Sequence, residues 1–178
     1  WDNIWENVFE KQEWGKYPPQ SLIRFIARNY YQKVRNEIKI LEVGCGPGAN
    51  IWYLSREGFD VYGLEGSKVA IEKAKNRLIN ENLIAQLYVG DILNIPFSED
   101  FFDAVIDIEC ITHNSKKHTI TILSEIKRVL KKGGLFYSRT FNDETYVGEV
   151  KGDVNNLEYE SISGGPFDGK GFVRFTTE

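Results

Sequence analysis

Residues 38–49 read IKILEVGCGPGA, and this stretch decides the fold of the chain. Its first part is a short apolar run, the pattern of a buried strand in a parallel sheet. Gly44, Gly46 and Gly48 follow at once, and residues 50–56 then have the pattern of a helix. Glycines at such a junction let the backbone turn sharply and approach a ligand closely. The segment therefore predicts a nucleotide-type site in an α/β protein.

Strand and helix patterns alternate along the chain around this turn. We expect strands at residues 38–44, 60–64, 83–90, 101–109 and 135–141, and helices at residues 21–35, 50–56, 67–80 and 119–130. The last helix should end at residues 131–134, KKGG, with cations near its negative end and a glycine suited to a left-handed cap. The alternation predicts a doubly wound, mostly parallel sheet with helices on both faces.

The composition fits one folded domain. The chain has 178 residues, of which 42% are hydrophobic and 27% charged, as in ordinary globular proteins. The net charge is −4 and basic residues cluster no further than pairs, so nonspecific nucleic-acid binding has little support. No apolar run approaches the roughly 20 residues of a membrane span. Cys45 and Cys110 are isolated and lack metal-ligand spacing, so we expect a soluble, cytoplasmic protein without a bound metal.

The glycine turn alone is compatible with two cofactors, NAD and S-adenosylmethionine. Residues 44–49, GCGPGA, fit the GxGxxA fingerprint of dinucleotide-binding proteins, and Glu65 lies 21 residues beyond Gly44, where a ribose-binding acid belongs in either case. Glu42, before the first glycine, favours S-adenosylmethionine. An NAD-dependent oxidoreductase would also need a catalytic acid-base residue and a nicotinamide pocket, and no recognisable set is present. NAD binding remains the alternative at this point.

Three further segments decide between these cofactors. They are VYGLEGS at residues 61–67, YVGDILNIPFSEDFFDAVID at 88–107 and EIKRVLKKGGLF at 125–136. Together with LEVGCGPGAN at 41–50, they resemble in order and spacing the motifs of class I S-adenosylmethionine-dependent methyltransferases of the small-molecule, UbiE-like superfamily. The resemblance implies a Rossmann-like methyltransferase fold. That family's sheet normally ends in two more strands, which we expect to be missing from this chain.

The resemblance also implies a cofactor site for S-adenosylmethionine, with S-adenosylhomocysteine as the product. Glu65 would accept hydrogen bonds from both ribose hydroxyls, a task that suits a carboxylate. Asp91 would accept from the adenine amino group, and Ile92 would pack on its ring. The other residues implied around the glycine turn, the adenosine and the transferred methyl are Glu42, Gly44, Cys45, Gly46, Gly48, Gly66, Ser67, Asp107 and Ile108.

For the reaction, the resemblance implies direct in-line displacement, in which the enzyme positions the acceptor atom and excludes water. A hydroxyl acceptor would benefit from a base, and the candidates near residues 101–109 are His113, Glu109 and Asp107. His113 falls where relatives often carry a histidine, although packing or capping explains it equally well. We expect His118 on the surface. No (D/N)PP(Y/F) motif is present, so the expected acceptor is a small molecule rather than nucleic acid.

Three regions follow from these patterns: a helical, aromatic cap at residues 1–36, the S-adenosylmethionine-binding core at 37–141, and a glycine-rich insertion or lid at 142–178 that leads to an incomplete C-terminal part. In the cap, we expect Trp14 and Tyr17 to close the active site, since aromatic rings attract a sulfonium cation. A helix packed by its tryptophans explains that segment equally well.

Two questions stay open in the sequence. A noncatalytic S-adenosylmethionine-binding module is a second alternative to an enzyme, because a fold alone does not fix a function. Residues 176–178 could open a further helix. The sequence carries no indication of the oligomeric state.

Overall fold

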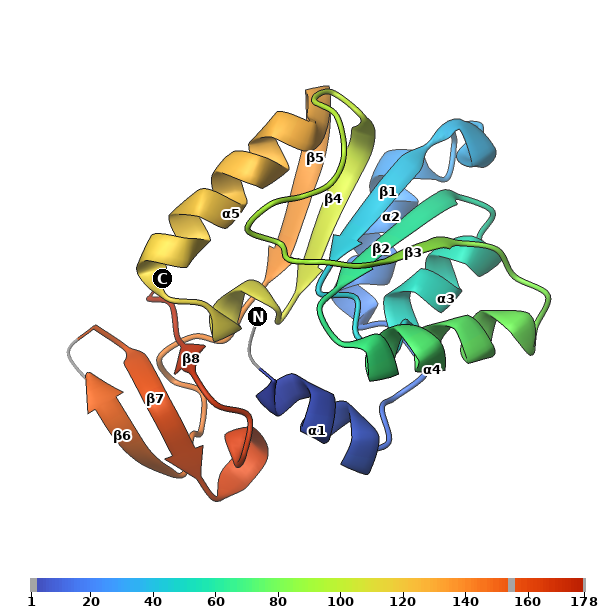
Figure 1. Cartoon of the computed structure of the whole chain (residues 1–178). Coiled ribbons are helices and arrows are strands. Elements are labelled where there is room, and N and C mark those ends of the chain that lie inside the picture. The colour runs from blue at the N-terminus through green and yellow to red at the C-terminus, as the bar shows by residue number, and fades with distance from the viewer. Residues whose placement is uncertain (1–2, 154–155, 178) are drawn as a thin grey trace.

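A computed structural model describes residues 3–153 and 156–177. It contains a five-stranded parallel sheet with helices on both faces and a three-stranded antiparallel sheet (Figure 1). The smaller sheet lies near the end of the larger one at which the parallel strands terminate. Among the helices of the described residues, none combines the length and apolar character that a membrane span needs.

The parallel sheet winds in two directions from its central strand. Its strands are β1 (Lys39–Val43), β2 (Asp60–Glu65), β3 (Gln86–Val89), β4 (Phe102–Ile108) and β5 (Leu130–Arg139). They lie in the order β3-β2-β1-β4-β5, so the chain builds outward from β1 to β3 and then returns to the other side of β1. This reversal is a topological switch point, where doubly wound sheets bind ligands. The predicted fold is confirmed, and all five predicted strands are present.

Helices bury both faces of this sheet. They are α2 (Gln20–Tyr30), α3 (Ala49–Arg56), α4 (Lys68–Ile79) and α5 (Lys116–Val129). A further helix, α1 (Ile4–Lys11), packs on α4, and the short 3-10 turns are η1 (Arg35–Glu37), η2 (Ile111–His113) and η3 (Gly165–Phe167). Ile40 of β1 belongs to the core cluster with Leu22 and Leu54, whereas its neighbour Leu41 belongs to the cluster with Ile122. Because both faces are covered, β1 has a nearly continuous apolar sequence rather than an alternating one.

The junction between α5 and β5 differs from the predicted helix cap. The helix ends at Val129, and Leu130 already pairs with Phe102 of β4. Residues 131–134 form an irregularity in the strand, in which Gly133 has the left-handed φ of +81° expected for it. Lys131 stabilises this junction through an ion pair, because its Nζ lies 2.8 Å from Asp103 Oδ2, and it is not part of the last helical turn.

The region after residue 141 contains strands that the sequence patterns did not predict. They are β6 (Glu149–Asp153), β7 (Glu158–Ser163) and β8 (Val173–Arg174), paired antiparallel. Tyr159, Phe167 and Phe175 belong to the separate small core of this sheet. The helix considered for residues 176–178 is not formed at Thr176, which instead makes an isolated bridge with Asn142. Glu178 lies outside the described residues.

Both flanking regions are fastened near the switch point. Helix α1 packs on α4, where Glu6 Oε1 accepts a hydrogen bond from the Val69 backbone N–H at 3.2 Å. The small sheet is attached to η2, because Thr112 Oγ1 donates to the Arg174 carbonyl. Figure 1 shows α1 below the carboxyl ends of the parallel strands, between α4 and the small sheet. Residues far apart in the sequence therefore face one region.

We expect Gly48→Ala to test the packing of the glycine turn. Gly48 has a φ of +77°, and an added Cβ would lie 2.8 Å from Ala74 Cβ. Strain and overlap together should lower the free energy of unfolding by roughly 2–4 kcal/mol. Gly58→Ala is the matched control, since Gly58 has a φ of +87° but open space around its Cα, and it should cost about 1 kcal/mol. Urea denaturation measures both; equal losses would contradict the packing role of Gly48.

Candidate cofactor site

A cavity of about 440 Å³ lies at the carboxyl ends of the parallel strands. Glu42 lies one residue before the end of β1, Glu65 ends β2 and Ile108 ends β4, and all three line the cavity. Residues from α1 and from the segment between β7 and β8 line it as well. The cavity therefore coincides with the switch point of the sheet.

The glycine turn forms one wall of the cavity. The backbone N–H groups of Gly44 and Cys45 donate to the Leu64 carbonyl at 2.8 and 3.2 Å, which ties the turn to β2. Gly44 has a φ of +66°, and a Cβ there would lie 2.1 Å from Cys110 Sγ. This position therefore requires glycine for both its conformation and its packing.

Glu65 joins two loops at this wall. Its Oε2 accepts from the Gly46 backbone N–H and its Oε1 from that of Ser67, each at 2.9 Å. Burial raises the pKa of Glu65, and the backbone hydrogen bonds partly offset that effect. Each carboxylate oxygen can accept more than one hydrogen bond, so Glu65 retains acceptor capacity toward the cavity it lines.

Glu42 is a buried acid with an unused oxygen. Its Oε1 accepts from Asn50 Nδ2 at 2.6 Å, whereas its Oε2 has no hydrogen-bond partner within the described part of the chain. Burial is the main cause that raises the pKa of Glu42 to about 8, and the nearby charges of Asp107 and Glu65 act in the same direction. A hydrogen-bond donor or a cation in the cavity would give Oε2 a partner and would stabilise the charged form of Glu42.

Asp91 and Ile92 line the cavity beyond β3. Asp91 Oδ1 accepts from the Leu93 backbone N–H at 2.9 Å, which fixes the loop in an Asx-type turn. The structure therefore brings the two residues assigned to the adenine into the same cavity as Glu65.

Asp107 supports the site from behind. It is fully buried and absent from the cavity wall. Its Oδ1 accepts from the backbone N–H groups of Cys110 and Ile111, each at 3.0 Å, and its Oδ2 accepts from Ser138 Oγ at 2.6 Å. Asp107 thus shapes the turn after β4 from behind the cavity wall.

His113 has a defined tautomer. Its Nδ1 lies 2.9 Å from the Phe172 carbonyl, and because a carbonyl only accepts, Nδ1 carries the proton and Nε2 presents a lone pair. The ring makes an edge contact with Trp5, with centroids 4.6 Å apart. Burial lowers the pKa of His113 to about 4, and the charge of Lys170 contributes. The side chain is therefore neutral at pH 7.

Glu109 is the other candidate base that lines the cavity, since Asp107 lies behind the wall. Glu109 has a φ of +63°, and its Oε1 lies 3.3 Å from Arg139 Nη1. Its carboxylate therefore already has a cationic partner. Of the two candidates, His113 has the freer acceptor atom.

The structure brings most of the predicted site residues together. Those that line the cavity are Trp14, Glu42, Gly44, Cys45, Gly46, Glu65, Gly66, Asp91, Ile92, Ile108, Glu109 and His113. Four others do not line it: Gly48 and Ser67 cap α3 and α4, Asp107 supports the turn after β4, and Tyr17 is 77% exposed and packs against Trp52. Tyr17 therefore does not close the cavity, because its side chain points largely into solvent.

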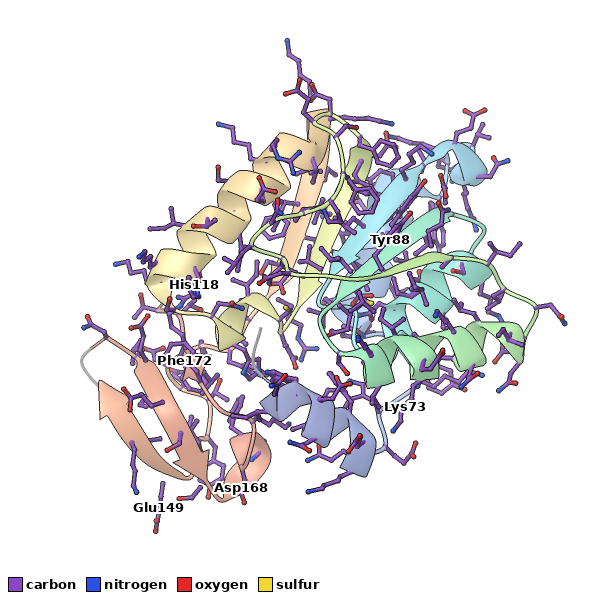
Figure 2. The ribbon with its side chains drawn as sticks, in the orientation of Figure 1. Lys73, Tyr88, His118, Glu149, Asp168 and Phe172 are labelled. Carbon is purple, nitrogen blue, oxygen red and sulfur yellow. The ribbon has the colours of Figure 1, made fainter. Side chains whose placement is uncertain are left out.

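Several lining residues were not singled out by the sequence motifs. Trp5 and Phe9 lie within the aromatic amino-terminal segment, whose density of rings was the available signal. Phe167 and Lys170 come from the glycine-rich region, which has no periodic pattern. His118 is exposed, as expected, yet it also lies on the wall of the cavity; Figure 2 shows it at the start of α5.

Comparisons with known proteins agree with this geometry. A family model described as "Methyltransferase domain" matches residues 40–134. Sterol 24-C-methyltransferase ERG6 of Saccharomyces cerevisiae is 32% identical over 170 residues, covering 87% of this chain and 43% of that protein. The phthiotriol/phenolphthiotriol dimycocerosates methyltransferase of Mycobacterium leprae is 30% identical over 142 residues, covering 76% and 51%.

Solved structures show the same fold. The crystal structure of PH0226 from Pyrococcus horikoshii has a TM-score of 0.64 and 25% identity, covering 79% of this chain and 71% of that one. The family match and the α/β fold show that the chain belongs to the class I S-adenosylmethionine-dependent methyltransferase domain family. The chain spans less than half the length of the yeast relative.

We expect the pH dependence of stability to report on Glu42. Its pKa rises from 4.5 to about 8 on folding, so the folded state keeps a proton that the unfolded state loses, and stability falls as pH rises through this window. Glu42→Gln removes the loss, and at about pH 8.5 it should be more stable than the wild type by roughly 2–4 kcal/mol. Urea unfolding without ligand, at about pH 4.5 and 8.5, measures the difference. A difference that is the same at both pH values would contradict the assignment.

Proposed function

We propose that this chain binds S-adenosylmethionine in the cavity and transfers its methyl group by in-line displacement to a small-molecule acceptor. The observation that carries the proposal is the pair of buried acids, Glu42 and Glu65, on the cavity wall beside the glycine turn. One acid has an unpartnered oxygen, and the other has acceptor capacity at the end of β2. These groups fit a cationic ligand that carries ribose hydroxyls.

Glu42 argues against NAD, whereas Glu65 is compatible with either cofactor. In a dinucleotide site the pyrophosphate lies at the glycine turn and the helix N-terminus, where backbone N–H groups meet its negative charge. Here the Gly46 N–H is already occupied by Glu65, and Glu42 lies on the same wall. In its charged form Glu42 would repel a pyrophosphate at the turn, whereas it would attract a sulfonium or an ammonium group.

S-adenosylmethionine, when bound, supplies an electrophilic methyl group, so the chain needs mainly to orient and desolvate the acceptor. We assign Glu65 to the ribose, Asp91 and Ile92 to the adenine, and Glu42 to the methionine end. His113 Nε2, with its lone pair, is suited to receive the proton of an acceptor hydroxyl.

The flanking regions act as two lids in this proposal. Residues 1–36 and 142–178 both contribute cavity wall around the core of residues 37–141. Rings from both lids line the cavity, which suits an acceptor with an apolar body. The sterol and phthiotriol methyltransferases among the relatives support a small apolar acceptor. The two free cysteines support a reducing compartment such as the cytoplasm.

We expect Glu65→Gln to weaken S-adenosylhomocysteine binding. Both Glu65 oxygens accept backbone N–H bonds, so an amide would set its own N–H₂ against one of these donors and spoil the ribose contact. The Kd should rise at least about tenfold, or roughly 1.4 kcal/mol. Glu99→Gln, on an exposed loop, is the control and should bind like the wild type. Calorimetry measures the affinities. Tight binding of NAD by the wild type, without a response to S-adenosylhomocysteine, would overturn the proposed function.

We expect His113→Asn to separate the structural role of Nδ1 from the proposed catalytic role of Nε2. Asparagine can still donate to the Phe172 carbonyl from near the Nδ1 position, but it has no atom at Nε2. If Nε2 receives the acceptor proton, kcat should fall by roughly 100-fold or more, with stability near that of the wild type. Release of S-adenosylhomocysteine in a screen of hydroxylated small molecules gives the rate. An unchanged kcat would rule out His113 as a base.

A further inference from the structure

One end of the cavity has a different chemistry from the cofactor residues. We call it the acceptor end and define it by Trp14, His113, Phe167 and Lys170. Trp14 comes from the amino-terminal lid, His113 from η2, Phe167 from η3, and Lys170 from the loop between η3 and β8. This end therefore combines aromatic rings with one ammonium group, which lies near the Trp14 ring.

Lys170 is held over Trp14 without an ion pair. Its Nζ lies 5.7 Å from the centroid of the Trp14 ring, and the side chain is half-buried. Among the described residues, no acid lies within ion-pair distance of it. Asp168, which directly follows η3, is exposed (Figure 2). Glu109, whose charge acts on Lys170 from further away, is paired with Arg139.

The loop fixes the position of this lysine. Gly169 and Gly171 on either side both have a φ of +70°, and the Lys170 backbone N–H donates to the Phe167 carbonyl at 3.0 Å. Burial lowers the pKa of Lys170, so its charge is partly desolvated and incompletely compensated. A charge in this condition gains from an anionic partner in the cavity.

We propose that Lys170 binds an anionic group, a carboxylate or a phosphate, on an acceptor whose apolar body lies between the aromatic rings. This inference rests on the proposed function, because it names the acceptor of the same site. The acids of the cavity wall do not compete for Lys170. Glu42, Glu65 and Asp91 lie at the carboxyl ends of β1, β2 and β3, where they face the cofactor.

This arrangement would separate the charges of the two substrates. The cationic cofactor lies against the buried acids, and the anionic end of the acceptor lies against Lys170, with His113 between the lids. An acceptor held at its anionic end and along its apolar body has one orientation toward the methyl group, which in-line displacement requires. Lys170 would thus set specificity for charged over neutral acceptors.

A pair of fluorescent probes tests the inference without knowledge of the acceptor. 1-Anilinonaphthalene-8-sulfonate and N-phenyl-1-naphthylamine share an apolar body and differ in the anionic group. Each is titrated into the folded full chain saturated with S-adenosylhomocysteine. We expect the wild type to bind the anionic probe at least about tenfold more tightly, Lys170→Gln to lose this preference, and Lys170→Arg to keep it. Lys151→Gln, an exposed lysine on β6, is the charge-matched control and should keep the preference.

Two results with these probes would contradict an anion site at Lys170. Equal affinity of the wild type for both probes would overturn the inference. So would a Lys170→Gln variant that weakens both probes alike, because Lys170 would then act only as a contact between the lids. Displacement of the anionic probe by benzoate or phenyl phosphate, at least about tenfold stronger than by benzyl alcohol, would support the site and show which anion it prefers.

The proposed function fails separately from this inference. Calorimetry with S-adenosylhomocysteine alone tests the cofactor site, and its failure would reject the methyltransferase proposal. The two probes can then be compared in the chain without ligand, where a preference that depends on Lys170 would still show an anion site.

Discussion

The Glu65 carboxylate is the interaction on which the site depends. One oxygen holds the turn after β1 through Gly46, and the other holds the turn after β2 through Ser67. Ser67 in turn caps α4, with its Oγ accepting from the Ala70 backbone N–H at 3.0 Å. One buried acid thus fixes the relative position of two strand ends and one helix start. A ligand that hydrogen-bonds Glu65 meets a group whose orientation is already set, so little ordering entropy is lost on binding.

The buried acids around the cavity lower the stability of the folded chain. Glu42, Glu65 and Asp107 are all buried and all have raised pKa values, chiefly because burial disfavours their charged forms. Asp107 recovers part of this cost through three hydrogen bonds, whereas Glu42 Oε2 has no partner in the described chain. Strain or unmet polar groups at such positions are typical of functional sites. In our account, Glu42 is compensated when a cation occupies the cavity.

The sequence was sufficient to predict the parallel sheet and most of the cavity wall around the glycine turn, but not which residues of the two flanking regions line the cavity. The structure of residues 38–49 could be predicted from local sequence, because the apolar run, the glycines and the start of the helix follow one another in a single segment. The later motifs predicted the remaining loops of the core. Phe167 and Lys170 reach the cavity only because β7 and β8 pair and η2 holds the small sheet, and these contacts are distant in sequence. The prediction for Tyr17 was wrong because the density of aromatic residues indicates a lid but does not show which ring faces the cavity.

The most direct test of the central claim is a crystal structure of the chain soaked with S-adenosylhomocysteine. Our account places the ribose hydroxyls within hydrogen-bond distance of Glu65, the adenine against Ile92 and the amino acid end near Glu42 Oε2. Density for the ligand at these positions would establish the cofactor site. An empty cavity in well-diffracting crystals, or a ligand bound away from Glu65, would contradict the account.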